Sequence, residues 1–83
     1  MSQPKLTWPE LRRILRSFGV AEDPSRGKGS HTYFFKQFPD GEYGYPVPQH
    51  GKDVPSVYVK SLRKRLRLTP NDGISDAEFF GRR

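Results

Sequence analysis

Hydrophobic residues recur three or four positions apart over residues 7–18, which is the spacing of one face of an α-helix. Thr7 and Glu10 have the spacing of a capping box, and Pro9 falls in the first turn. We predict a helix over residues 7–18 that stops at Gly19. Its inward face would carry Trp8, Leu11, Ile14, Leu15 and Phe18.

The pattern changes to the alternation of a β-strand at residues 31–38, and aromatic residues on both faces favour a central strand. A Pro-Asp-Gly turn follows, and residues 43–49 are predicted to return as the partner strand. Pro46 and Pro48 place that strand at an edge of the sheet, because proline cannot donate to a ladder. Residues 20–24 are a candidate for a further short edge strand. One face of the central strand would carry His31, Tyr33, Phe35 and Gln37.

A second helix is predicted from Asp53, as its N-cap, to about Leu68, with Pro55 just inside it. Its inward face would carry Val54, Val57 or Tyr58, Leu62 and Leu66. A capping pair, Ser75 and Glu78, predicts a last short helix over residues 75–80. This order of elements indicates an α+β fold, an antiparallel sheet with helices packed on one face.

Composition narrows the classes of function. The 83 residues make one small domain, with a predicted core at about 6–68 and an extension at 69–83. The net charge of +6 favours a polyanionic partner, with nucleic acid ahead of a membrane surface or an acidic protein. The absence of cysteine excludes disulfides and thiolate chemistry. Without a membrane span or a signal segment, the expected location is the cytoplasm.

Cations concentrate in the second predicted helix, where five fall within eight residues: Lys60, Arg63, Lys64, Arg65 and Arg67. We expect them on its outer surface, where their mutual repulsion favours an anionic ligand such as RNA phosphate. Arg12, Arg13 and Arg16 on the first helix are more simply a solvated face.

His31 is the best candidate for chemistry, because it lies where a glycine-containing loop becomes a strand and its ordinary pKa suits proton transfer near neutral pH. Arg26 and Lys28 in the loop are candidate phosphate ligands, together with the backbone N–H groups of Gly29 and Ser30. The loop lacks the spacing of a P-loop, so nucleotide binding of that type is not expected.

Structural roles compete with these assignments. His31 can equally be a packed sheet-face histidine, and His50 can be a complementary acid, an RNA contact or a residue that orders a helix start. Tyr33, Tyr43 and Tyr45 can stack on unpaired bases, although packing is the commoner role of strand tyrosines. A metal site built from His31, His50 and Asp53 is not expected, because nothing supplies further ligands at short spacing. No cofactor is predicted.

Two motifs within this order of elements resemble those of a known family. Residues 27–31 read Gly-Lys-Gly-Ser-His after the first helix, and residues 47–51 read Val-Pro-Gln-His-Gly at the end of the hairpin, with Asp53 following. Across residues 6–68 the chain resembles HicA toxins, the small ribonucleases (mRNA interferases) of type II toxin–antitoxin pairs.

The resemblance implies an α-β-β-β-α fold like that of double-stranded RNA-binding domains, with His31 as the catalytic residue. It also implies a HicB-type antitoxin that covers the active site and regulates transcription of the pair. Three classes of function follow: a metal-independent endoribonuclease acting on mRNA, an RNA-binding module without catalysis, and a protein-interaction module with a positive surface.

Overall fold

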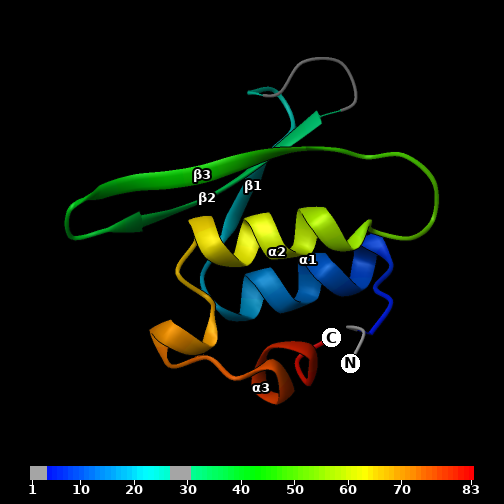
Figure 1. The fold of residues 1–83 in the computed structure, drawn as a ribbon. Helices are drawn as coiled ribbons and strands as arrows, with labels where there is room; N and C mark the ends of the chain where they lie inside the picture. Colours follow the sequence, from blue (N-terminus) through cyan, green and yellow to red (C-terminus); the bar gives the residue numbers. More distant parts are fainter. Residues whose placement is uncertain (1–3, 27–30) are drawn as a thin grey trace.

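The computed structural model describes residues 4–26 and 31–83, and within them the predicted α+β fold is confirmed (Figure 1). In sequence order, one principal helix precedes the three strands and the other comes after them, followed by a 3₁₀ turn and a short helix. The elements in order are α1 (Trp8–Ser17), β1 (Ala21–Asp23), β2 (His31–Phe38), β3 (Gly41–Pro48), α2 (Ser56–Arg65), η1 (Pro70–Asp72) and α3 (Asp76–Phe80).

The sheet is antiparallel with strand order β1-β2-β3, so β2 is central and β3 is an edge strand, as predicted. Helices α1 and α2 pack side by side on one face of the sheet, and α3 lies beyond them, away from the sheet (Figure 1). Thr32 and Phe34 are buried toward the helices. Because side chains alternate along a strand, His31, Tyr33 and Phe35 belong to the opposite, open face.

Helix α1 begins as its sequence predicts. The Glu10 backbone N–H donates to Thr7 Oγ1 at 3.4 Å, and the Thr7 backbone N–H donates to Glu10 Oε1 at 2.9 Å, which completes the capping box. That backbone hydrogen bond, together with one from the Thr7 hydroxyl, lowers the pKa of Glu10. Gly19 follows the helix with φ 81°, a left-handed conformation that suits glycine.

One hydrophobic core lies between the sheet and the helices. Both α1 and α2 contribute buried side chains to it, and Phe34 and Val47 contribute from the sheet. Phe79 and Phe80 of α3 are also buried there, although they are far along the chain from the other core residues. The predicted α1 face is buried except Phe18, which is partly exposed and stacks on Phe79 with ring centroids 6.0 Å apart.

Helix α2 does not begin where the sequence analysis placed it. Its N-cap is Pro55, with no side-chain hydrogen bond, and Asp53 instead forms an isolated antiparallel bridge with Thr7. The Val54 backbone N–H donates to the Leu6 carbonyl at 2.8 Å in the same region. The segment before α2 is therefore held by backbone pairing to the entry of α1, which excludes Asp53 from the capping position.

The end of α2 also differs from the prediction, and its inward face agrees in part. The helix stops at Arg65 because Arg67 takes a left-handed conformation with φ 59° and the Leu68 N–H bonds back to the Arg63 carbonyl at 2.7 Å. Val54, Leu62 and Leu66 are buried as predicted. Of the two alternatives between them, Tyr58 packs against the core and Val57 is 60% exposed, while Val59, which was not predicted, is fully buried. No helix in residues 4–26 and 31–83 is long and apolar enough to cross a membrane.

Candidate functional site

His31 is the first residue of the central strand and is half-buried on the open face of the sheet. It pairs with Pro48, the last residue of β3, so His50 follows two residues later at the same end of the sheet and is exposed. Both histidines thus belong to one end of the sheet. The predicted phosphate ligands Lys28, Gly29 and Ser30 lie outside the described residues, and their role stays a prediction.

Arg26 lies over two aromatic rings of the open face. The Tyr33 and Phe35 rings stack at 5.6 Å between centroids, and the Arg26 guanidinium carbon is 4.4 Å from the first centroid and 5.1 Å from the second. Arg26 Nη2 also donates to Glu42 Oε2 at 2.9 Å, and this hydrogen bond raises the pKa of the arginine. The predicted phosphate ligand Arg26 is therefore already paired with a carboxylate, although its side chain is 45% exposed.

Glycine at position 44 makes room for the Tyr33 ring. A Cβ added to Gly44 would collide with the end of that ring and would lie 2.6 Å from the Phe34 carbonyl oxygen. Tyr33 belongs to β2, the strand that His31 begins, and its ring therefore lies over Gly44 of β3 on the open face of the sheet. Tyr33 is fixed by packing as well as being a candidate for stacking on a base.

Arg63 corrects the prediction that all the cations of α2 lie on its outer surface. Its residue is only 8% exposed, because it lies one helical turn after the fully buried Val59, on the face of α2 that packs on the core. Its guanidinium donates to the Leu68 carbonyl at 2.8 Å, the Ile74 carbonyl at 3.1 Å and Asp76 Oδ1 at 2.7 Å. It also lies 4.5 Å from the Phe79 ring centroid. Arg63 is a structural residue that ties the chain after α2 to the helix.

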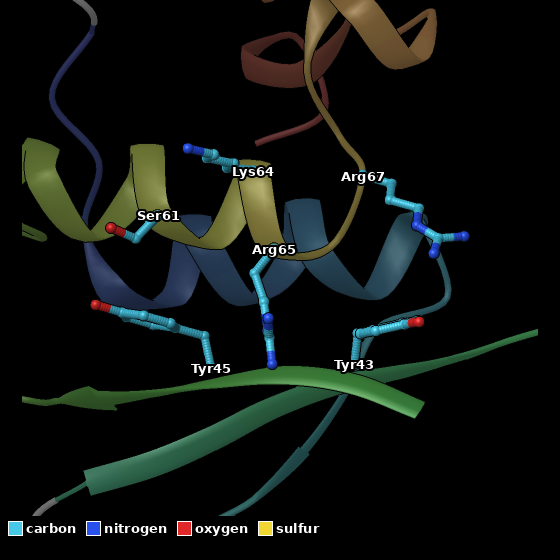
Figure 2. Close-up of a pocket in the computed structure, with 6 residues that line it drawn as sticks. All are labelled: Tyr43, Tyr45, Ser61, Lys64, Arg65 and Arg67. Atoms are coloured by element: carbon cyan, nitrogen blue, oxygen red, sulfur yellow. The ribbon is translucent and has the colours of Figure 1, made fainter. Parts of the chain in front are cut away.

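The remaining cations of this run are exposed: Lys60, Lys64, Arg65 and Arg67. Lys64, Arg65 and Arg67 line a groove of about 440 Å³ between β3 and the end of α2 (Figure 2). Tyr43, Tyr45 and Ser61 complete its lining. The two tyrosines rise from β3 toward α2, on the side of the sheet opposite His31. The sequence placed these residues on different elements, and only the packing of α2 on β3 brings them together.

Hydrogen bonds fix two of the arginines in this groove. Arg65 Nε donates to the Gly44 carbonyl at 3.2 Å, and its side chain lies between the two tyrosines (Figure 2). Arg67 Nη2 donates to Asp40 Oδ2 at 2.7 Å, and the Tyr43 hydroxyl donates to the same oxygen at 2.9 Å. These two hydrogen bonds lower the pKa of Asp40, and the bond from Arg67 has the larger effect. The Asp40 carboxylate beside the groove is thus already paired with a cation.

Metal ligands do not gather in the part of the chain that the structure describes. There, no three side chains of His, Cys, Asp or Glu lie close enough to hold an ion.

These features define a class of protein, a small basic α+β domain in which a histidine is the first residue of the central strand. The family model described as HicA toxin of bacterial toxin–antitoxin matches residues 8–68, well over half of the chain. The chain therefore belongs to the HicA toxin family, and the expected resemblance is confirmed. Membership implies an antitoxin partner. No curated protein and no solved structure matched the chain.

Proposed function

We propose that this HicA toxin is a metal-independent endoribonuclease that cuts mRNA, with His31 as general base or general acid. The observation that carries the proposal is the position of His31. His31 is the first residue of the central strand, and its side chain belongs to the open face of the sheet. Members of the HicA family are commonly mRNA interferases. The strand fixes the backbone of His31, while its half-buried side chain remains within reach of a ligand.

RNA supplies its own nucleophile, which keeps the chemical demand on a small protein low. The ribose 2′-oxygen attacks phosphorus, the bond from phosphorus to the 5′-oxygen breaks, and a 2′,3′-cyclic phosphate and a 5′-hydroxyl result. One group must accept the 2′-hydroxyl proton and another must protonate the departing 5′-oxygen. His31 performs one of these transfers. His50, at the same end of the sheet, is an auxiliary group that positions RNA or performs the other transfer.

Cations stabilise the charge that builds on phosphorus and hold the RNA. We assign the scissile phosphate to Lys28 and the backbone of Gly29 and Ser30, with Arg26 beside them. To contact a phosphate, Arg26 must either use the N–H groups that Glu42 leaves free or release its ion pair with Glu42. Lys60, Lys64 and Arg67 are exposed and hold RNA farther from the cut, whereas the buried Arg63 is not part of this set. A HicB-type antitoxin that covers His31 is the proposed partner, and the cytoplasm the proposed location.

RNA cleavage by the wild-type chain and by His31→Ala tests the proposal. The purified proteins are incubated with RNA in excess EDTA, and the products are resolved on a denaturing gel with their termini identified. We expect wild-type protein to yield cyclic phosphate ends, and the variant to be slower by about 10²- to 10⁴-fold. His50→Ala is the matched control, with a smaller loss expected.

The other results have separate meanings. Equal cutting by His31→Ala would overturn the catalytic assignment. RNA that is bound but left intact by a folded wild-type protein would favour the non-catalytic RNA-binding module. Cleavage that EDTA abolishes would contradict metal independence while leaving a ribonuclease.

A further inference from the structure

We propose that the groove between β3 and α2 binds a nucleotide of single-stranded RNA, with a base against Tyr45 and a phosphate at Lys64. The inference rests on the proposed function in that RNA is the ligand, but it assigns a binding site separate from His31. Tyr43 and Tyr45 point toward the helices, whereas His31 belongs to the open face of the sheet. The groove therefore anchors RNA without touching the bond that is cut.

Tyr45 is the ring that remains available in this groove. Tyr43 is already engaged, because its hydroxyl bonds to Asp40 and the Arg67 guanidinium lies 4.8 Å from its ring centroid. Tyr45 packs partly against the core, and in residues 4–26 and 31–83 no ring stacking or cation–π contact involves it. Core packing fixes the ring while part of it faces the groove, which is the arrangement of an aromatic platform for a base.

Lys64 is the cation best placed for a phosphate. It is exposed, and no hydrogen bond or ion pair joins its ammonium group to any other residue that the structure describes. Arg65 lies between the two tyrosines and uses Nε for the Gly44 carbonyl, so its terminal nitrogens are left for a second phosphate contact (Figure 2). Ser61 adds a hydroxyl to the lining. An ammonium, a guanidinium and a ring thus face one space.

Charge favours RNA over a protein segment as the occupant. Three cations line the groove, and the nearby Asp40 is paired with Arg67. Lysine is depleted at protein interfaces, whereas grooves that follow a nucleic-acid backbone are positive and carry aromatic rings. A volume of about 440 Å³ also lies in the range of small-ligand sites. A single strand is required, because duplex bases are already stacked.

RNA binding by the non-cleaving His31→Ala protein tests the groove. Fluorescence anisotropy with a labelled, unstructured RNA of about ten nucleotides is measured over a range of NaCl concentrations. Tyr45→Leu, which keeps an apolar side chain but no ring, should weaken binding by about 5- to 150-fold. Tyr45→Phe, which keeps the ring, should bind like the parent protein. Circular dichroism checks that each variant is folded.

The salt dependence tests the phosphate contact. Lys64→Ala should reduce the slope of log affinity against log salt by about 0.7, the value for one phosphate of a single strand. Arg13→Ala is the matched control, because it removes one exposed charge from α1 and should leave the slope unchanged. Equal slopes for the two variants, or equal affinities for Tyr45→Leu and Tyr45→Phe, would overturn the inference. So would competition by an acidic peptide as effective as that by RNA.

Cleavage kinetics separate this inference from the proposed function. In the active chain, Tyr45→Leu should raise KM and leave kcat nearly unchanged, because the groove holds substrate equally in the ground and transition states. A fall in kcat with unchanged KM would contradict the groove as an RNA anchor. If His31→Ala cuts like wild type, the catalytic assignment fails, while the binding results still decide the groove.

Discussion

Arg63 and Lys64 are neighbours in a run of cations, yet their surroundings are opposite. Arg63 is buried under three hydrogen bonds, whereas Lys64 is exposed beside the groove. The two residues differ by 100° around α2, and the packing of the helix on the core and on the segment after it decides which of them faces inward. Charge patterning alone therefore marks a basic helix but cannot distinguish a ligand-binding cation from a structural one.

Arg67 is the residue whose backbone is most unusual. Its φ of 59° closes α2 in a position where glycine is the common choice. Comparison of Arg67→Gly with Arg67→Ala isolates this backbone effect, because both variants lose the Asp40 ion pair and the contact with Phe38. We expect the glycine variant to be more stable by about 1 kcal/mol, since alanine retains the left-handed strain.

Urea unfolding followed by circular dichroism measures that difference. At an ordinary helical position glycine is the less stable of the two, so the expected sign is the reverse of the usual one. An alanine variant as stable as the glycine variant would show that Arg67 leaves the left-handed conformation in solution.

At the scale of elements, α1 and α2 begin by different means. A capping box defines the start of α1, whereas α2 follows a segment that pairs with the entry of α1 through its backbone. Asp53 resembles a cap in sequence because its neighbours resemble a helix start. Its actual partner, Thr7, lies 46 positions earlier in the chain, so no local pattern reveals it.

Thr7→Ala and Asp53→Ala should therefore have unequal effects. Loss of the Thr7 side chain removes both of its hydrogen bonds with Glu10, and we expect a loss of about 1 kcal/mol in the free energy of unfolding. Loss of the Asp53 side chain leaves the backbone bridge in place, and we expect a change within about 0.5 kcal/mol. Thermal unfolding of the two variants gives the comparison, and a larger loss for Asp53→Ala would restore it as a cap.

The edge of the sheet is protected by its own sequence. Gly44, Pro46 and Pro48 alternate along β3, so their backbone groups point to the same side of the strand. The prolines have no N–H to offer, and Arg65 occupies the Gly44 carbonyl. These features limit strand pairing with another chain at this edge and leave the adjacent groove as the accessible surface.

At the scale of the whole molecule, the folded core includes residues beyond the segment that the family model matches. The match ends at residue 68, whereas Phe79 and Phe80 of α3 are buried in the core beneath α1 and α2 (Figure 1). Arg63 connects the two parts through Leu68, Ile74 and Asp76. The segment after α2 is therefore integrated into the fold rather than appended to it.

Arg63→Ala should destabilise the whole domain by about 2–4 kcal/mol, because the buried Leu68 carbonyl and the part-buried Ile74 carbonyl lose a charged donor and the Phe79 ring loses a packing partner. Lys64→Ala, one residue away, should change the free energy of unfolding by no more than about 0.5 kcal/mol. Urea unfolding of both variants gives the measurement. Equal stability would contradict the structural role of Arg63 and return it to the exposed cations proposed to bind RNA.

The sequence by itself determined the α+β class, the central position of the strand that His31 begins, the edge strand with its prolines, and the capping of α1. Each depends on periodicity or on contacts between residues three or four apart. The family resemblance also followed from local motifs. Only the tertiary structure decided the start and phase of α2, and with them the burial of Arg63. It alone brought Tyr45 and Lys64 to one groove, because residues on different elements meet only when the chain packs.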